Sequence, residues 1–253
     1  MAKIKIEKKL VEGELVIFDK DGTLVDFCYT WEKIARARIR ILAEKMRVSS
    51  FVTREISRSF GIDPDTGFID PRGPLVQASQ EDEAIIAASI LYREGYPWDE
   101  ARQIAEEVFQ MAENRYPVEQ LTRPAPGVKM VIPKLKRAGL KIAVATIDSY
   151  KRTLEVLEII GLKNFFDLII SKDDVKNPKP HPEMILTICN RLNIPPEKAL
   201  IVGDTVNDMI MGKRARVALT VGILNGVNTP ETFSGLADVI IKSLSQIDIN
   251  SGG

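Results

Sequence analysis

Five short apolar runs alternate with helical patterns in the second half of the chain, and this alternation restricts the fold more than any other feature. The runs are KIAVAT (141–146), DLIIS (167–171), ALIVGD (199–204), ALTVGI (218–223) and DVIIK (238–242). Near-continuous apolar runs of this length are typical of strands buried on both faces of a parallel sheet. Helical patterns with one apolar face separate them, as over 149–160 and 182–192. We therefore predict an α/β fold, a doubly wound parallel sheet with right-handed crossovers.

The stretch 27–119 has a different character. It carries helical patterns at 31–47, 51–60, 80–94 and 97–115 and no run typical of a buried strand. It follows an earlier apolar run at 15–18, and it is far longer than the dozen or so residues that a crossover between parallel strands needs. We predict an inserted, mainly helical cap at 27–119, with the α/β core formed by 1–26 and 120–253.

Composition limits the classes of partner. Lys and Arg total 35, equal to Asp and Glu, so there is no overall charge bias toward nucleic acid or an anionic membrane. No apolar stretch approaches the roughly 20 residues of a membrane span, and the N-terminus lacks the apolar segment of a secretory signal. Cys28 and Cys189 match no disulfide or metal pattern. We predict a cytoplasmic protein whose partner is neither a nucleic acid nor a membrane, and nothing in the sequence indicates the oligomeric state.

Four polar clusters follow the predicted strands or lie just beyond their ends. They are Asp19-Lys20-Asp21-Gly22-Thr23, Thr146, KNPKPHPE (176–183) and GDTVND (203–208). Ligands of open parallel sheets bind outside the carboxyl ends of the strands. Packed together, these clusters would gather four carboxylates around one point, those of Asp19, Asp21, Asp204 and Asp208.

Four clustered carboxylates require a cation, or else their pKa values must rise sharply. Oxygen ligands with no nitrogen or sulfur favour Mg²⁺, and the only histidine is His181. One carboxylate at such a metal can attack phosphorus, and a second, two residues on, can donate and accept the proton. A lysine and a hydroxyl group would hold the phosphoryl oxygens. The pattern therefore indicates phosphoryl transfer.

The segments FDKDGTLVD and GDTVND, with Thr146 and with Lys179 in KPHPE, resemble the four motifs of the haloacid dehalogenase-like (HAD) superfamily, in the same order. The resemblance covers the α/β core and implies a Rossmann-like fold there. It implies Asp19 as nucleophile, Asp21 as general acid and base, and Thr146 and Lys179 on the phosphoryl group. It also implies a Mg²⁺ ion held by Asp19, by the backbone carbonyl of Asp21, by Asp204, and by Asp208 directly or through water.

Some positions depart from the family pattern or allow two readings. Ile147 follows Thr146, at a position where the family often has a small polar residue. The Ile147 side chain cannot bond phosphate, so we expect its backbone N–H to do so. Gly22 is a further expected phosphate-binding residue. Asp148 is an extra carboxylate that we expect to cap the next helix. Lys20 points off the catalytic face by strand alternation, which favours a surface or supporting role. His181 is expected to be a loop or capping residue.

The resemblance implies a Mg²⁺-dependent phosphomonoester hydrolase that acts on a small phosphorylated metabolite through an aspartyl-phosphate. A helical cap between the first two motifs is similar to the C1 cap of phosphoglycolate phosphatase-like members. A phosphomutase of the β-phosphoglucomutase type shares all four motifs and is the nearest alternative. A non-catalytic interaction protein on the same scaffold is a second alternative. The retention of all the catalytic carboxylates argues against it, because clustered charges lower stability and are kept only where function needs them. In the cap, Phe27, Trp31, Arg93 and Trp98 are candidates for substrate recognition, but core packing or surface ion pairing is the favoured interpretation for each.

Overall fold

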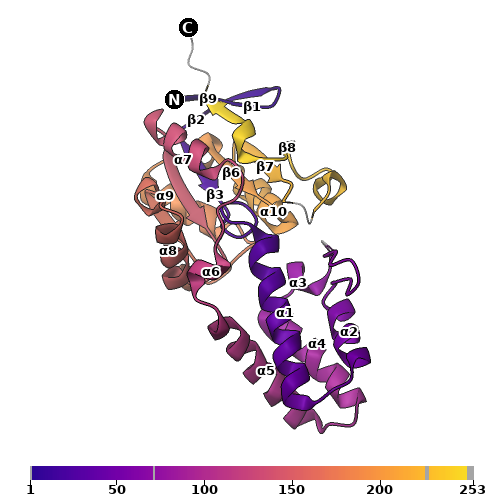
Figure 1. The fold of residues 1–253 in the computed structure, drawn as a ribbon. Coiled ribbons are helices and arrows are strands. Elements are labelled where there is room, and N and C mark those ends of the chain that lie inside the picture. Colours follow the sequence, from indigo (N-terminus) through magenta and orange to yellow (C-terminus); the bar gives the residue numbers. More distant parts are fainter. Residues whose placement is uncertain (1, 71, 226–227, 250–253) are drawn as a thin grey trace. The chain divides into compact units, whose positions relative to one another are not determined.

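The protein is described here by a computed structural model, which covers residues 2–70, 72–225 and 228–249 (Figure 1). The chain forms two compact units, 1–28 with 122–253, and 29–121. Their boundaries lie close to those predicted for the core and the insertion. That the second unit acts as a cap on the first stays a prediction.

The first unit is built on a six-stranded parallel sheet with the strand order β5-β4-β3-β6-β7-β8. The strands are β3 (Leu15–Phe18), β4 (Lys141–Ala145), β5 (Leu168–Ile170), β6 (Ala199–Gly203), β7 (Leu219–Ile223) and β8 (Val239–Ile241). Each of the five predicted apolar runs is a strand, shortened by one or two residues at its ends. The predicted α/β class with a doubly wound parallel sheet is confirmed.

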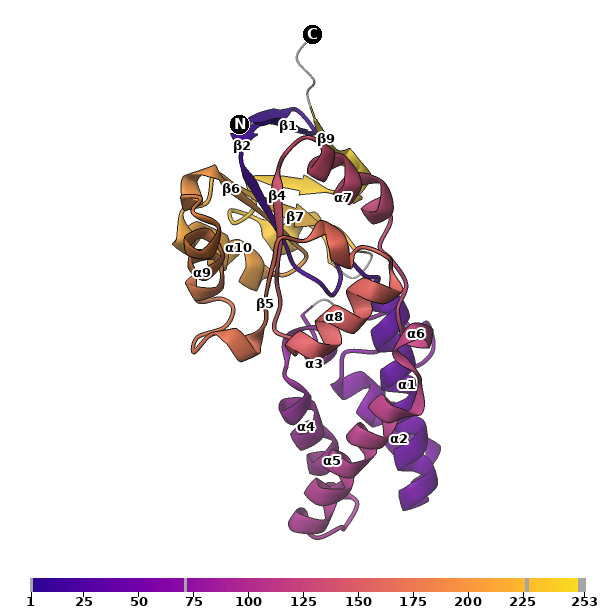
Figure 2. The same cartoon turned by 90° about the vertical axis from the view of Figure 1, so that its left-hand side faces the viewer.

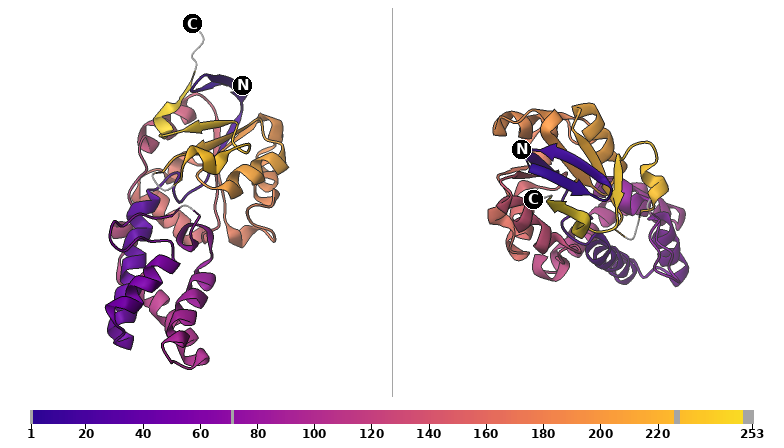
Figure 3. Two further views of the ribbon diagram at one scale, coloured as in Figure 1. Left: turned by 90° about the vertical axis from the view of Figure 1, so that its right-hand side faces the viewer. Right: turned by 90° about the horizontal axis from the view of Figure 1, so that it is seen from above.

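Helices cover both faces of this sheet (Figures 2 and 3). α9 (Glu183–Leu192) and α10 (Val206–Ala215) lie on one face, while α7 (Val128–Arg137) and α8 (Tyr150–Ile159) lie on the other. α7 continues through Pro133. Short 3₁₀ turns complete the connections at η1 (Lys163–Phe165), η2 (Lys172–Asp174), η3 (Pro196–Lys198), η4 (Pro230–Phe233) and η5 (Leu244–Gln246).

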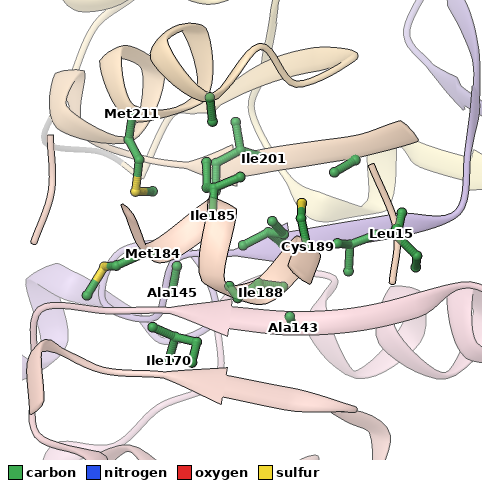
Figure 4. Close-up of a cluster of buried hydrophobic side chains, with 14 residues drawn as sticks. Leu15, Ala143, Ala145, Ile170, Met184, Ile185, Ile188, Cys189, Ile201 and Met211 are labelled. Atoms are coloured by element: carbon green, nitrogen blue, oxygen red, sulfur yellow. The ribbon is translucent and has the colours of Figure 1, made fainter. Parts of the chain in front are cut away.

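The core under α9 and α10 fixes which side chains of β3 face which way. Leu15 and Ile17 pack in one buried cluster with Ile185, Ile188 and other side chains of α9 (Figure 4). Side chains alternate along a strand, so the residue after Phe18, Asp19, continues the row of Leu15 and Ile17. Lys20 continues the opposite row, on the side of α7 and α8.

A second, three-stranded antiparallel sheet was absent from the sequence prediction. It consists of β1 (Ala2–Ile6), β2 (Lys9–Gly13) and β9 (Ile247–Ile249), in the order β2-β1-β9. Ile4 and Ile6 are fully buried and alternate with lysines. This period of two is the signal that could have revealed β1, but the pairing with β9 is set by a contact across the whole chain.

The second unit is helical. Its elements are α1 (Phe27–Met46, whose first two residues belong to the first unit), α2 (Ser50–Ser59), α3 (Pro74–Gln77), α4 (Gln80–Arg93), α5 (Trp98–Arg115) and α6 (Val118–Leu121). The four predicted helices are present within a few residues of their expected ends. Ser79 and Asp82 form a capping box at the start of α4. Inside the unit a buried ion pair joins Arg38 to Glu83. No helix in the described ranges is both long and apolar enough to cross a membrane.

Candidate active site

The first and fourth motifs meet because β3 and β6 are neighbours in the sheet. Phe18 pairs with Val202, and the backbone N–H of Asp19 donates to the carbonyl of Val202 at 2.9 Å. Asp19 therefore stands beside the end of β6, where Asp204 follows. Both carboxylates are held at the carboxyl edge of the sheet, the place where open α/β sheets bind ligands.

Three of the predicted carboxylates form one buried group. Asp19, Asp204 and Asp208 each place an oxygen within 4.8 Å of the others. Lys179, from the loop between β5 and α9, inserts its ammonium group among them. Its Nζ lies 2.5 Å from Asp19 Oδ1 and 2.6 Å from Asp208 Oδ1, and its side chain is 5% exposed. This carboxylate triad and Lys179 form the candidate active site.

Negative charge exceeds positive charge in this group. Burial raises the pKa of Asp19 to about 6, although the ammonium of Lys179 opposes the shift. Burial, with the neighbouring charges of Asp19 and Asp208, also raises the pKa of Asp204 well above its usual range. Burial would lower the pKa of Lys179, but the two adjacent carboxylates outweigh it and raise that pKa. Lys179 therefore stays charged, and one further positive charge would relieve the remaining repulsion.

Asp208 is fixed by the start of α10. Its Oδ2 accepts hydrogen bonds from the backbone N–H and the hydroxyl of Thr205, at 3.1 and 2.6 Å, in a capping box. This leaves Oδ1 directed at Lys179. Gly203 makes room for the carboxylate, since a Cβ there would lie 2.4 Å from Asp208 Cγ. The Asp208 side chain thus both caps α10 and belongs to the candidate active site.

Asp204 is held by Thr23, a member of the first polar cluster, and by two asparagines that the sequence analysis did not single out. Asn225 Nδ2 donates to Asp204 Oδ2 at 2.8 Å, and the hydroxyl of Thr23 donates to Oδ1 at 3.2 Å. Asn228 Nδ2 donates to the backbone carbonyls of Asp204 and Ile223, at 2.7 and 3.0 Å. The signal was available, because these asparagines follow β7 and polar residues after a parallel strand belong to the same edge.

Asp21 lies outside the triad. Its carboxylate pairs with Lys20, whose Nζ is 2.9 Å from Oδ1 and 2.8 Å from Oδ2. The expectation of four side chains around one point is therefore wrong for this carboxylate. Ligation of a metal by the Asp21 backbone carbonyl, which the family resemblance implies, concerns a different atom and stays a prediction.

The residues after β4 are arranged differently from expectation at one position. Thr146 is buried, and its hydroxyl accepts from the backbone N–H of Asp148 at 3.1 Å. The predicted helix-capping role of Asp148 is wrong, because Ser149 is the N-cap of α8 and accepts from Arg152 N. Asp148 instead binds Lys20. The Ile147 side chain is 59% exposed, and its backbone role in binding phosphate, like that of Gly22, stays a prediction.

His181 is a loop residue, as expected. Its side chain is 52% exposed, and its Nδ1 accepts from the backbone N–H of Glu183 at 3.3 Å. In the helical unit, Arg93 forms an ion pair with Glu55 at 2.6 Å. Trp98 packs edge to face against the Tyr92 ring. These contacts favour the packing and ion-pair reading of the two side chains over substrate recognition.

The donor set of the triad fits a hard divalent cation. Three buried carboxylates with one lysine leave excess negative charge, and all available donor atoms are oxygens. Mg²⁺ prefers such ligands and commonly takes only one or two carboxylates, with waters and phosphate oxygens completing its shell. Asp19, Asp204 and Asp208 are the residues that would hold it.

Comparison with known proteins agrees with the fold. The family model of haloacid dehalogenase-like hydrolases matches residues 14–216, and the chain belongs to this family of enzymes. A protein of Dickeya dadantii described as "Probable phosphatase IndB" is 32% identical over 92% of this chain and 91% of its own length. A phosphoglycolate phosphatase of Psychrobacter arcticus is 26% identical over 92% of this chain and 98% of its own.

A solved structure shares the fold. The crystal structure of "a predicted phosphoglycolate phosphatase" of Haemophilus somnus superposes with a TM-score of 0.67 at 21% identity, over 93% of this chain and 96% of that one. The family resemblance stated from the motifs is confirmed by the family model that matches residues 14–216.

Proposed function

We propose that this protein is a Mg²⁺-dependent phosphomonoesterase that acts on a small phosphorylated metabolite through an aspartyl-phosphate on Asp19. The observation that carries the proposal is the Lys179 ammonium clamped between Asp19 and Asp208, with Asp204 completing the triad. An attacking carboxylate, a fixed cation and a cation-binding carboxylate pair are what phosphoryl transfer requires. The phosphatase names of full-length relatives support it.

Asp19 suits the role of nucleophile. It stands rigidly at the end of β3, hydrogen-bonded through its backbone to Val202. In the first step one oxygen of Asp19 attacks phosphorus, and the bond from phosphorus to the leaving oxygen breaks. Asp21 gives its proton to that oxygen. Mg²⁺, when bound, would offset the negative charge of the phosphoryl group.

The second step regenerates the enzyme. Asp21, now a carboxylate, takes a proton from water, and the resulting hydroxide attacks the phosphorus of the aspartyl-phosphate. The bond between phosphorus and Asp19 breaks, and inorganic phosphate leaves. Lys179 offsets charge on the phosphoryl oxygens in both steps. Thr146 and the backbone N–H groups of Gly22 and Ile147 are proposed to hold those oxygens.

The compartment and partners belong to the same proposal. The proposed substrate is a small phosphate ester in the cytoplasm, and neither a nucleic acid nor a membrane is proposed as a partner. The equal numbers of basic and acidic residues in the chain agree with this. The substrate itself would be set by residues outside the triad. Phosphoglycolate is the first ester to test, because relatives carry that name.

The test is phosphate release from a panel of phosphate esters with Mg²⁺, comparing the wild type with Asp19→Asn. The proposal expects release by the wild type, none after EDTA treatment, and none by Asp19→Asn. Release that requires a bisphosphate activator would instead identify a phosphomutase. Absence of release from every ester, with folded protein and Mg²⁺ present, would overturn the proposal.

A further inference from the structure

Lys20 is a buried charge that the proposed reaction does not use. It lies between Asp19 and Asp21, and its side chain is only 2% exposed. Strand alternation turns it away from the triad, toward the face of the sheet covered by α7 and α8. Burying an ammonium group is costly unless oppositely charged groups surround it. A lysine at this position therefore needs partners on that face.

Its partners come from two motif-bearing loops. Lys20 Nζ lies 2.9 Å from Asp21 Oδ1 and 2.7 Å from Asp148 Oδ2. Burial would lower the pKa of Lys20, but the carboxylates of Asp21 and Asp148 outweigh this effect and raise it. The lysine stays charged. It connects the turn after β3 to the loop after β4.

Asp148 is itself anchored. Its backbone N–H donates to the Thr146 hydroxyl at 3.1 Å, and its Oδ1 accepts from the backbone N–H of Ser149 at 2.7 Å. Arg152 Nε lies 3.6 Å from its Oδ2, too far for a hydrogen bond. The Asp148 carboxylate is thus held in a fixed position before α8, where it pairs with the Lys20 ammonium.

Asp21 depends on this arrangement for its orientation. Its side chain is 26% exposed and stands outside the triad. In the described part of the chain, its one side-chain partner is Lys20. A general acid and base must be held within hydrogen-bond reach of the oxygen it serves. A carboxylate with this exposure would otherwise sample several rotamers.

We propose that the Lys20–Asp148 ion pair positions Asp21 for proton transfer. The inference rests on the proposed function, because it takes Asp21 as the general acid and base. Lys20 and Asp148 are positioning residues and do not touch the substrate. Their loss should spare the attack by Asp19 and impair the two proton transfers made by Asp21.

Two substrates separate these steps. p-Nitrophenolate leaves without being protonated, so its release reports the attack by Asp19, whereas an alkyl phosphate needs Asp21 for both steps. In Lys20→Met we expect a burst of p-nitrophenolate, which the wild type does not show, followed by slow turnover, and accumulation of aspartyl-phosphate by intact mass. With glycerol phosphate we expect no burst and a kcat lower by roughly 10- to 100-fold, a part of the 10²–10⁴ typical of such groups. With glycerol phosphate KM should change by less than about twofold, because uniform binding is untouched. With p-nitrophenyl phosphate KM should fall together with kcat, because the aspartyl-phosphate accumulates when only the second step is slowed.

Asp148→Asn provides a second, nearly isosteric variant. It removes the anchor but keeps the Lys20–Asp21 contact, so the same burst with a smaller loss in kcat is expected. The double variant should be no slower than Lys20→Met, because both residues act through one carboxylate. Lys198→Met is the matched control. It breaks a lysine–carboxylate pair with Glu14, 2.7 Å long, at the opposite end of β3, where β6 begins, and should show no burst and a wild-type kcat.

The outcomes separate this inference from the proposed function. Wild-type rates without a burst in both Lys20→Met and Asp148→Asn would overturn the positioning role and leave the phosphatase proposal intact. Equal losses on both substrates without phosphorylated protein would also overturn it, since the attack itself would then be impaired. If Lys20→Met does not fold, Asp148→Asn decides alone. A wild type that releases no phosphate would instead overturn the proposed function.

Discussion

Gly22 lies so close to Asp204 that a Cβ built on it would fall 2.1 Å from Asp204 Oδ2. Its φ of +84° is in the left-handed region that favours glycine. The turn after Asp21 therefore brings the backbone of the first motif directly against the carboxylate that follows the neighbouring strand, β6. The packing of these two motifs depends on the missing side chain.

Gly22→Ala should abolish most of the activity as well as reduce stability. The added methyl group must displace the Asp204 carboxylate, and we expect a fall in kcat/KM of at least roughly 100-fold, the scale of a 1 Å misplacement. Gly139→Ala is the control, because Gly139 has a φ of +82° and open space around its Cβ. It should cost about 1 kcal/mol or more in stability and keep wild-type kcat/KM. Equal activity in the two variants would contradict the close-approach argument.

Asp19→Asn and Asp21→Asn should fail in different ways. Asp19→Asn removes the nucleophile, so no phosphorylated protein can form. Asp21→Asn keeps the nucleophile and removes the group that activates water, so aspartyl-phosphate should build up with p-nitrophenyl phosphate, and turnover should fall by roughly 10²–10⁴. Rapid quench and intact mass measure the label. A phosphoryl group on the Asp19→Asn protein would show that the nucleophile is a different carboxylate.

Activity should require a divalent ion, and Asn225 should set how tightly it binds. Asn225 orients the Asp204 carboxylate through a 2.8 Å hydrogen bond. Such supporting contacts are worth roughly 10- to 100-fold in metal affinity, so Asn225→Ala should raise the Mg²⁺ concentration for half-maximal activity by that factor. Asn190→Ala, on the exposed side of α9, is the matched control. Full turnover after exhaustive EDTA treatment would refute the metal requirement.

The metal-free protein should carry a stability penalty that grows with pH. Burial raises the pKa of Asp19 from 3.8 to about 6, so in this window the folded state holds a proton that the unfolded chain has released. Stability falls with rising pH wherever the folded state binds more protons. Relative to Asp19→Asn, the wild type in EDTA should lose up to about 3 kcal/mol across the window.

Urea unfolding at a series of pH values measures this difference. Adding Mg²⁺ at neutral pH should restore wild-type stability, because the ion binds the deprotonated folded form. Asp19→Asn should show a smaller response to the ion. A wild type that gains stability over the variant as pH rises would mean that Lys179, not burial, dominates the Asp19 carboxylate.

Local patterns were sufficient for the sheet and the motif positions. Strands such as β4 and β6 are buried on both faces, so their sequences are apolar throughout and stand out without an alignment. The helices of the inserted unit could also be predicted from local signals, such as an apolar stripe along one face or an N-cap residue such as Ser79. The order of polar clusters after strands then identified Asp19, Thr146, Lys179, Asp204 and Asp208 as candidates.

The sequence by itself thus determined the fold class, the two-part organisation and most candidate residues, because burial and chain geometry leave periodic and positional signals. Tertiary structure alone decided the partners. In the tertiary structure Lys179 lies between Asp19 and Asp208. The Asp21 and Asp148 carboxylates both pair with Lys20, and Asp148 does not cap α8. These are contacts between residues up to 160 positions apart, and they depend on strand neighbours and side-chain direction. No local pattern encodes which distant charge a buried ammonium group will meet.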